Sequence, residues 1–428
     1  MHGGVVCSLK NITPLGGTDF LVTAQALGYT IILNKNTEGI DSPGIFFDSE
    51  LQLSEEFATT HDLVRRKNPD GSRAGGFFEE NRRVRAIRLK GSKSEGFWMP
   101  LSCLEYAGNV SSLKSGDVIA VFNGHPICDK YVTPETRRAA RRAKKLAKFK
   151  CPGFPEHVYT EQLKRSLDCI RPGDLITLTE KIHGTSHRVT LTRPLLPRKK
   201  GGFFTELWAK ITKKPDVTIG DWTIVNGTRR VVLNPELVDK DNPGYRLIHT
   251  IGKNFHRNEV VFGEIVGWDG DRPIQPSVKV VDDKQLKKVY GDTITYSYGI
   301  PKGESKFVVY RIIQVNPDKE GHYVELSYKA MCLRAEELGY STVPFIEQFI
   351  YDGDQDYLVE RVMKHVEDGS GFPIPSLLCP AHIREGVVVR VDGERTKYFK
   401  AKSTVFLIME GHQKDMPEFV DPEEVQSV

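Results

Sequence analysis

Short apolar runs of the strand type recur along the 428-residue chain, and they constrain its fold more than any other feature. In residues 5–131 the runs FLVTAQAL, YTIILNK, GIFF, VRAIRL, GFWMPL and DVIAVF are separated by Gly, Pro, Asn and Asp. Runs of this length and spacing are typical of a small, mostly-β barrel or sandwich. The polar, Gly-rich stretch 54–81 inside this region is predicted to be a long loop.

The second half of the chain alternates strand-type runs with helical stretches. The strand-type runs are DLITLTEKI, SHRVTLT, DWTIVN, EVVFGEIVGW, KFVVYRIIQV and EGVVVRV, and the helical ones are LVDKDNPGYRLIHTIGKNF, YKAMCLRAEELGY and DQDYLVERVMKHVEDG. Because helices do not regularly separate the strands, we expect an α+β fold with antiparallel sheets. Between the halves, PETRRAARRAKKLAKFK consists of strong helix formers. We therefore predict a mostly-β module at 1–133, a basic helical linker at 134–152 and an α+β domain at 153–428.

Charge and composition narrow the class of protein. The net charge of +4 is small, but basic residues cluster at 82–93 and 137–150, and residues 193–214 are predicted to be an inserted basic hairpin or loop. Such clusters favour contact with a phosphate backbone when they accompany a nucleotide site. No apolar stretch approaches the roughly 20 residues of a membrane span, and no secretory signal is evident, so we expect a cytoplasmic protein. Seven cysteines without a C-x-x-C pair indicate neither a disulfide framework nor a zinc site.

The sharpest motif is Glu180-Lys181-Ile182-His183-Gly184, which follows the strand-type run DLITLT. A lysine at the end of a strand can project its amine into a pocket, and a following glycine lets the backbone approach a ligand closely. The K-x-x-G pattern alone is common in surface turns, so its weight depends on what accompanies it.

Three later segments each place charge beside an apolar strand-type run. VVFGEIVGW carries Glu264, REGVVVRV carries Glu385, and YFKAKS carries Lys400 and Lys402. Side chains two residues apart in a strand point to the same face, so the two ammonium groups should lie together. Burying these four charges is costly unless they meet one another or a ligand.

This set of residue types suits one kind of chemistry. Two carboxylates and water suit Mg²⁺, which prefers oxygen ligands, and two lysines suit a triphosphate. A third lysine held near other cations loses its proton more readily and can act as a nucleophile. The predicted reaction is attack of this lysine on the α-phosphorus of a nucleotide, with metal and lysines stabilising the charge on the oxygens.

The order and spacing of these motifs resemble the covalent nucleotidyltransferase superfamily of ligases and capping enzymes. EKIHGTS resembles the nucleotide-binding motif of ATP-dependent RNA ligases, whereas DNA ligases and capping enzymes more often show K-x-D-G. The likeness is to bacterial and phage RNA ligases with an OB-like module in front of the catalytic domain, and it includes the FPEHVYTEQL segment. It implies an OB-like nucleic-acid-binding module at 1–133 and an ATP-grasp-like nucleotidyltransferase domain at 153–428. A DNA ligase or GTP-using capping enzyme, and a non-catalytic RNA-binding protein, stay as alternatives.

The resemblance also assigns roles to residues of the first motif. Lys181 matches the nucleophile that becomes lysyl-AMP, and His183 matches the histidine associated with passing AMP to an RNA 5′-phosphate. Glu180 matches a residue near the ribose or adenine. Ile182 and Gly184 belong to the same nucleotide-binding motif.

Further roles fall on the later segments. Arg229, or its neighbour Arg230, matches the arginine that touches ribose or phosphate, and Tyr310 matches an aromatic that stacks on adenine. Arg311 stands where the family usually has Asp, and Ser186 where relatives often have Asn. The two remaining pairs complete the set: Glu264 and Glu385 match metal-linked, nucleotide-binding glutamates, and Lys400 and Lys402 match phosphate-binding lysines.

The resemblance implies ATP and Mg²⁺ or Mn²⁺ as cofactors. Its implied substrate is RNA with 5′-phosphate and 3′-OH ends, expected at nicks in duplexes during RNA repair, with no membrane partner and a monomeric enzyme. In the N-terminal module, Phe97 or Trp98 is available for base stacking, although either side chain could equally belong to the core.

Overall fold

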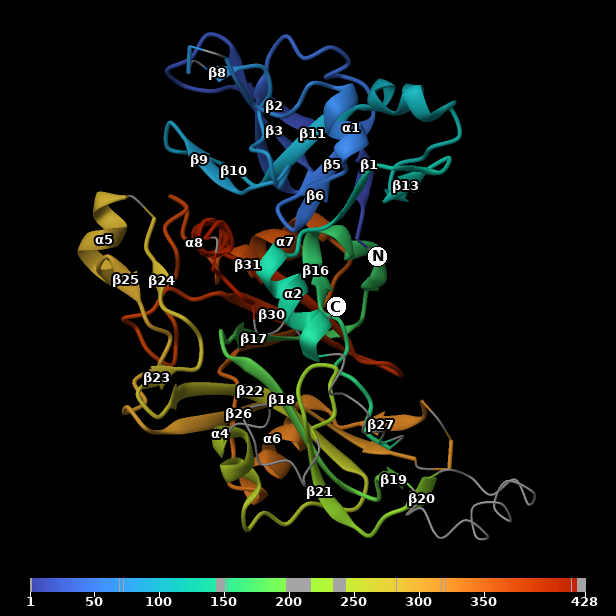
Figure 1. The fold of residues 1–428 in the computed structure, drawn as a ribbon, viewed down its shortest axis with the longest axis vertical. Coiled ribbons are helices and arrows are strands. Elements are labelled where there is room, and N and C mark those ends of the chain that lie inside the picture. Colours follow the sequence, from blue (N-terminus) through green and yellow to red (C-terminus); the bar gives the residue numbers. More distant parts are fainter. Residues whose placement is uncertain are drawn as a thin grey trace.

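The computed structural model describes residues 2–68, 70–71, 73–143, 151, 153–197, 217–233, 244–281, 283–316, 318–319, 321–416 and 418–421. Its elements form three tiers along the long axis of the molecule (Figure 1). The N-terminal module, residues 2–133, lies at the top, a middle sheet includes strands near both ends of residues 153–421, and a lower sheet lies at the bottom. No helix among the described residues is long and apolar enough to cross a membrane.

The N-terminal module is mostly β, as predicted. An antiparallel sheet runs in the order β11-β5-β1-β12, and β2-β3-β4 form a second sheet. Its described strands are β1 (Gly4–Cys7), β2 (Lys10–Pro14), β3 (Leu21–Ala26), β4 (Tyr29–Asn34), β5 (Gly44–Asp48), β6 (Leu51–Leu53), β7 (Arg66–Lys67), β8 (Arg73–Ala74), β9 (Ile87–Leu89), β10 (Ser92–Ser94), β11 (Gly96–Pro100), β12 (Val118–Ile119), β13 (Val121–Phe122), β14 (His125–Pro126) and β15 (Cys128–Lys130). A 3₁₀ helix, η1 (Leu101–Ala107), follows β11. The OB-like topology and the module boundaries stay predictions.

The prediction of a long loop at 54–81 is wrong for its first part and for its packing. Helix α1 (Glu55–Thr60) begins there, and the Ser54 hydroxyl caps it by accepting from the Phe57 backbone N–H at 3.0 Å. Phe57 and Phe78 are both buried in the module core. A serine N-cap followed by acidic residues is a helix-start signal, and two buried aromatics are enough to fix an otherwise polar segment.

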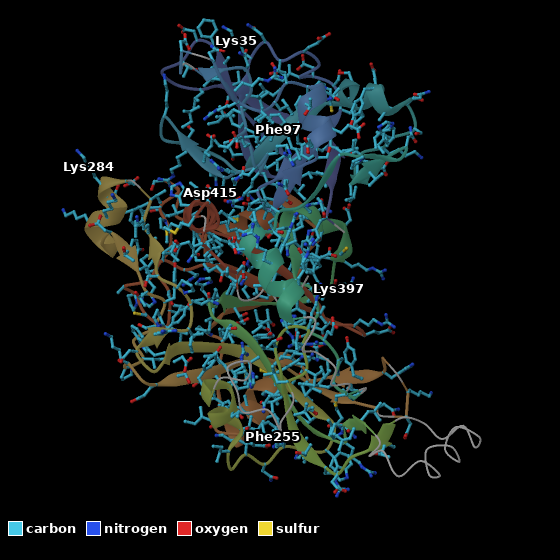
Figure 2. All side chains as sticks on the ribbon, in the orientation of Figure 1. Lys35, Phe97, Phe255, Lys284, Lys397 and Asp415 are labelled. Atoms are coloured by element: carbon cyan, nitrogen blue, oxygen red, sulfur yellow. The ribbon has the colours of Figure 1, made fainter. Side chains whose placement is uncertain are left out.

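The two candidate stacking residues of this module differ in their surroundings. Trp98 is buried in the core, and its indole N–H donates to the Cys7 carbonyl at 3.5 Å, so it is a core residue. Phe97 is partly buried within the N-terminal tier (Figure 2), where its ring stacks on that of Phe77 at 6.1 Å. Phe77 is exposed.

The middle sheet runs in the order β16-β31-β30-β17-β29 and packs against helices α7 and α8. Ile176, Leu178, Val387 and Val389 form much of its core, because both faces of the central strands are covered. Its elements are β16 (Glu161–Gln162), β17 (Leu175–Lys181), β29 (Phe345–Ile350), β30 (Gly386–Asp392), β31 (Lys397–Lys402), α7 (Gln355–Met363) and α8 (Thr404–Lys414), with 3₁₀ helices η2 (Leu163–Arg165) and η3 (Leu167–Cys169).

The lower sheet runs in the order β21-β18-β22-β26-β27. In addition, β23 pairs with β22, and β28 pairs with β26. Its strands are β18 (Thr185–Thr192), β21 (Thr223–Gly227), β22 (Glu259–Asp269), β23 (Arg272–Pro273), β26 (Ser305–Val315), β27 (Tyr323–Glu325) and β28 (Ser341–Thr342). Nearby lie the pairs β19 (Leu195–Pro197) with β20 (Val217–Ile219) and β24 (Val278–Lys279) with β25 (Thr293–Ile294). The prediction of antiparallel sheets is confirmed; β16 with β31 and β26 with β28 are parallel pairs.

Most predicted helices are present. They are α2 (Pro134–Ala143), α6 (Tyr328–Glu337) and α7, while the predicted stretch 237–255 holds α4 (Gly244–Leu247) and 3₁₀ helix η4 (Ile248–Thr250). Residues 144–150 of the basic linker, 198–214 of the basic insertion and 237–243 lie outside the described residues. Helices α5 (Lys284–Tyr290) and α8, whose N-caps are Asp283 and Ser403, were not predicted from the sequence.

Candidate active site

A cavity between the three tiers collects most of the predicted site residues. Lys181, His183, Glu264, Glu385 and Lys400 are among the residues that line it, as are Ile182, Gly184, Arg229 and Lys402. Among the described lining residues, seven side chains are basic and five are acidic. The surplus of positive charge in a shared cavity suits an anionic ligand.

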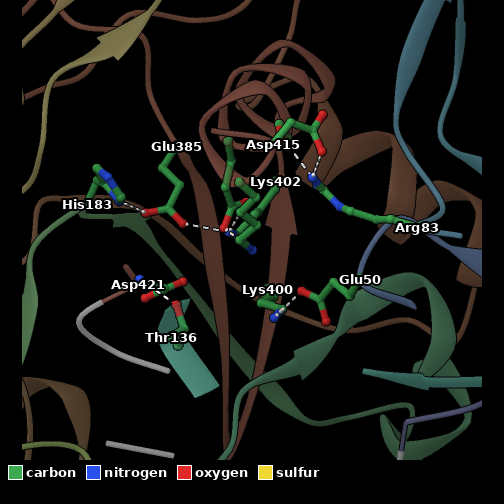
Figure 3. Close-up of polar contacts among 12 residues, drawn as sticks. Glu50, Arg83, Thr136, His183, Glu385, Lys400, Lys402, Asp415 and Asp421 are labelled. Carbon is green, nitrogen blue, oxygen red and sulfur yellow. Dashed lines mark hydrogen bonds and ion pairs between the residues drawn. The ribbon is translucent and has the colours of Figure 1, made fainter. Parts of the chain in front are cut away.

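Lys181 ends β17, and its register partner on β30 is Gly386, the residue after Glu385. This register brings the Lys181 Nζ to 2.9 Å from the Glu385 Oε1. The Lys402 Nζ lies 3.1 Å from the same oxygen (Figure 3). Lys181 at the end of β17 and Lys402 at the end of β31 therefore both contact the carboxylate of Glu385, the residue that precedes β30.

Glu385 is 3% exposed, so its ionisation depends on its neighbours. Burial would raise the pKa of its carboxyl group, but the positive charges of Lys181 and Lys402 hold that pKa well below its usual range. The carboxylate is ionised at neutral pH. Its negative charge neutralises part of the positive charge of Lys181 and Lys402.

His183 is oriented by packing and by the same carboxylate. Its Nδ1 lies 3.7 Å from the Glu385 Oε2, and its ring meets those of Tyr296 and Phe406 edge-on. The His183 backbone N–H donates to the Tyr298 hydroxyl at 2.7 Å. The ring is therefore fixed beside the nucleophile candidate before any ligand arrives.

Gly184 lets the motif pass close to β22. A Cβ at this position would lie 2.8 Å from the Ile265 carbonyl oxygen and 3.0 Å from the Glu264 Cβ, distances that real Cβ contacts rarely or never show. The Gln275 side-chain amide donates to the Gly184 carbonyl. The absence of a side chain thus keeps Glu264 and the lysine motif on adjacent walls of the cavity.

Lys400 and Lys402 project from β31 into the cavity, and the prediction that they share one face is confirmed. Each has a carboxylate partner: the Lys400 Nζ donates to Glu50 at 2.7 Å, and the Lys402 Nζ donates to Glu410 at 3.0 Å. The Lys414 Nζ donates to the other oxygen of Glu410 at 2.9 Å. These ion pairs hold both ammonium groups at the cavity wall.

Arg229 lines the cavity, whereas Arg230 is half exposed and pairs with Glu156 at 3.9 Å. Tyr310 is not among the lining residues; its ring lies 5.3 Å from that of His157, which does line the cavity. Burial, followed by the charge of Arg229, lowers the pKa of His157 to about 3, so its ring is neutral at pH 7. The stacking role of Tyr310 stays a prediction.

Glu180 is 1% exposed and lies behind the cavity wall. One of its carboxylate oxygens accepts from the Leu377 backbone N–H at 2.7 Å, and Arg384 lies 3.9 Å from the same oxygen. Burial raises the pKa of this carboxyl group. Its role at ribose or adenine stays a prediction.

Arg311, which departs from the family pattern, is buried in an ion pair with Glu325 at 2.8 Å and is not among the lining residues.

Several cavity residues were not identified from the sequence. The FPEH segment was the only signal for His157. Arg83 lies in the basic cluster 82–93, which the sequence analysis associated with phosphate contact. No local signal marked the other missed lining residues, which include Glu50, Lys130, Gln275, Glu410 and Lys414.

The donor set fits a hard divalent cation. Glu264 and Glu385 both line the cavity, although no group of three or more His, Cys, Asp or Glu side chains among the described residues forms a metal cage. Mg²⁺ commonly takes one or two carboxylates and completes its shell with water and phosphate oxygens. Two carboxylates in one cavity are therefore sufficient as protein ligands.

Comparison with known proteins gives the following matches. A family profile described as RNA ligase matches residues 174–404, more than half of the chain. No curated protein matches the chain. Among solved structures, the Naegleria gruberi RNA ligase with PPi is 16% identical, with a TM-score of 0.56 over 96% of this chain and 99% of that chain.

Two further forms of the same Naegleria enzyme are also similar. A mutant with AMP and Mn is 16% identical, with a TM-score of 0.57 over 97% of this chain and 100% of that chain. A mutant with ATP and Mn is 15% identical, with a TM-score of 0.55 over 96% and 99%. At this level of identity, the likeness establishes a shared fold.

Proposed function

The chain belongs to the RNA ligase family, and from this premise we propose that it is an ATP-dependent ligase that joins 5′-phosphate and 3′-OH ends of RNA. One observation carries the proposal: the Lys181 Nζ lies 2.9 Å from Glu385, in a cavity shared with Lys400 and Lys402. A nucleophilic amine beside phosphate-binding groups is the arrangement that nucleotidyl transfer requires.

In the first step, the Lys181 Nζ attacks the α-phosphorus of ATP. An N–P bond forms, the bond from the α-phosphorus to its bridging oxygen breaks, pyrophosphate leaves and the amine releases its proton. Lys400 and Lys402 are placed to stabilise charge on the phosphate oxygens. The similar Naegleria structures contain ATP with Mn, AMP with Mn, or PPi, and ATP and PPi are the reactant and the leaving product of such a step.

The second and third steps are also transfers at phosphorus. A 5′-phosphate oxygen of RNA attacks the phosphorus of lysyl-AMP and releases Lys181, and an RNA 3′-OH then attacks the activated 5′-phosphorus and releases AMP. Such steps depend chiefly on positioning and electrostatics. We assign His183 to the second step, because its fixed ring lies within 3.7 Å of the carboxylate that also contacts the nucleophile.

Glu264 and Glu385 would hold a divalent cation in this scheme. Bound there, Mg²⁺ or Mn²⁺ would neutralise phosphate charge.

The lining of the same cavity supports a nucleic-acid substrate. Arg83 and Lys130 of the N-terminal module line it together with the catalytic residues, so RNA bound to that module would reach Lys181. We propose a nicked duplex as the substrate, RNA repair as the role and a monomer as the working form. An OB-like N-terminal module would supply the RNA surface.

The first test is incubation with ATP labelled at the α-phosphate, followed by a denaturing gel and a chase with 5′-phosphorylated nicked RNA. We expect label on the wild-type protein, none on Lys181→Ala, and label that chases slowly into RNA on His183→Ala. Lys397→Met is the control for loss of a lysine, since Lys397 lies on β31 with the cavity lysines Lys400 and Lys402 but is exposed. Absence of label on folded wild type would favour a non-catalytic RNA-binding protein, and preferred use of GTP or DNA nicks would favour the capping-enzyme or DNA-ligase alternative.

A further inference from the structure

Glu50 belongs to the N-terminal module, and its carboxylate lies in the cavity beside the ammonium group of Lys400. It lies between β5 and β6, and its Oε1 accepts from the Lys400 Nζ at 2.7 Å (Figure 3). The same oxygen accepts from the Gln162 side-chain amide at 3.0 Å. The side chains of Lys400 and Glu50 are 12% and 19% exposed, so this is a largely buried ion pair between parts of the chain 350 residues apart.

The position of Glu50 is fixed from both sides. Its backbone N–H donates to the Asp48 Oδ1 at 2.9 Å, and Arg165 donates to the Asp48 Oδ2 at 2.5 Å. On the other side, Gln162 of β16 is the parallel register partner of Lys400 of β31, so both reach the same carboxylate. The position of the Glu50–Lys400 contact is therefore set by the backbone of the N-terminal module on one side and by the β16–β31 pair of the middle sheet on the other.

Glu50 stays ionised in this setting. Burial would raise the pKa of its carboxyl group, but the charges of Lys400, Lys402 and Lys130 hold it well below its usual range. A phosphate that approached Lys400 would meet this negative charge first. One ammonium group cannot serve a phosphate and an adjacent carboxylate without repulsion between the two anions.

We propose that the Glu50 carboxylate occupies the place at Lys400 that a phosphate oxygen of the nucleotide takes, so that the two anions compete for one ammonium group. The proposal rests on the proposed function only in taking this polyphosphate to be that of a nucleotide. Binding of the polyphosphate displaces the Glu50 carboxylate. Because Glu50 belongs to the N-terminal module, its release loosens one contact of that module with the middle sheet and couples the module to nucleotide occupancy.

A second ion pair across the same border serves as a control. Lys93 of the N-terminal module pairs with Glu367, which lies outside that module. Neither residue is among those that line the cavity. Replacing Glu367 weakens the border without changing the charge that faces Lys400.

The test measures binding of inorganic tripolyphosphate by calorimetry to the full chain, which requires no adenylation. We expect Glu50→Gln to lower the Kd about tenfold, which corresponds to about 1.4 kcal/mol. Glu367→Gln should bind as the wild type does. In a Lys400→Met background, the gain from Glu50→Gln should be much smaller, since the ammonium group for which the two anions compete is absent.

An unchanged or weaker affinity of Glu50→Gln would overturn the proposal, as would an equal gain in the Lys400→Met background. If Glu50→Gln does not fold, Glu50→Asp keeps the charge on a shorter side chain and should show a smaller gain in affinity, whereas no gain would overturn the competition. Amide hydrogen exchange of residues 44–53 should accelerate when tripolyphosphate binds to wild type, and unchanged or slower exchange would overturn the coupling. If tripolyphosphate binding and hydrogen exchange behave as expected but no lysyl-AMP forms, only the proposed function is refuted. If lysyl-AMP forms but tripolyphosphate binding and hydrogen exchange do not respond to Glu50, only this inference is refuted.

Discussion

Replacing Arg188 by methionine tests whether a single buried arginine positions two segments of the cavity wall. Arg188 is 1% exposed, and its guanidinium donates to the carbonyls of Thr228 at 2.8 Å, Phe154 at 2.7 Å and Pro155. Its Cζ lies 4.2 Å from the centroid of the Phe154 ring. Methionine keeps much of the apolar volume but cannot donate to any of the three carbonyls.

The magnitude follows from these contacts. A hydrogen bond to a charged group contributes about 1.5–3 kcal/mol, and the three bonds share one side chain, so their losses do not add fully. We expect the free energy of unfolding to fall by about 3–5 kcal/mol, as for other buried charged groups whose partners are left unsatisfied. The released segments carry His157 and Arg229, and a shift of about 1 Å can cost about a hundredfold in rate. We therefore expect the KM for ATP to rise at least about tenfold.

Urea unfolding and the ATP dependence of lysyl-AMP formation measure the two effects. Arg390→Met is the matched control, because Arg390 is also buried and donates to the Leu326 carbonyl and to Asp392, but it is not among the residues that line the cavity. It should lose comparable stability and keep the wild-type KM. A stability loss below about 1 kcal/mol in Arg188→Met would refute the hydrogen-bond argument, and an unchanged KM would refute the positioning role.

Two further predictions concern stability and loop geometry. Burial, followed by the charge of Lys253, lowers the pKa of His249 from 6.5 to about 4, so the unfolded chain binds this proton more readily and stability should fall by up to about 3 kcal/mol as the pH drops from 6.5 to 4. Thermal unfolding against pH should show a shallower fall in His249→Gln, and an identical slope would contradict the assignment. Gly184→Ala should lose about 1–3 kcal/mol of stability, because its Cβ would meet the Ile265 carbonyl oxygen at 2.8 Å. It should also slow lysyl-AMP formation. Wild-type stability together with a wild-type rate of lysyl-AMP formation would show that the backbone at residue 184 accommodates a Cβ without cost.

The sequence alone was sufficient where the deciding property is local. Alternation with period two predicted that Lys400 and Lys402 share one face, and the strand-then-glycine order placed Lys181 at a strand end. Both were confirmed because a strand fixes side-chain direction wherever it lies in the molecule. The antiparallel α+β architecture followed from the same short-range patterns.

Local patterns were insufficient where burial depends on distant partners. The 54–81 stretch is polar overall, yet Phe57 and Phe78 anchor it in a core built from strands on either side. Trp98 was an open alternative between core and stacking surface, and its neighbours in the core decided it. Composition reports how polar a segment is, but not which of its few apolar side chains find a partner.

The sequence by itself determined the strands, the lysine motif and the set of charges that nucleotidyl transfer requires. Only the tertiary structure decided that Glu50 faces Lys400, that Arg188 holds the wall carrying His157, and that Glu180 lies behind the cavity. These contacts depend on how separate sheets and modules dock against one another. Docking is set by the fit of whole surfaces, which no run of neighbouring residues encodes.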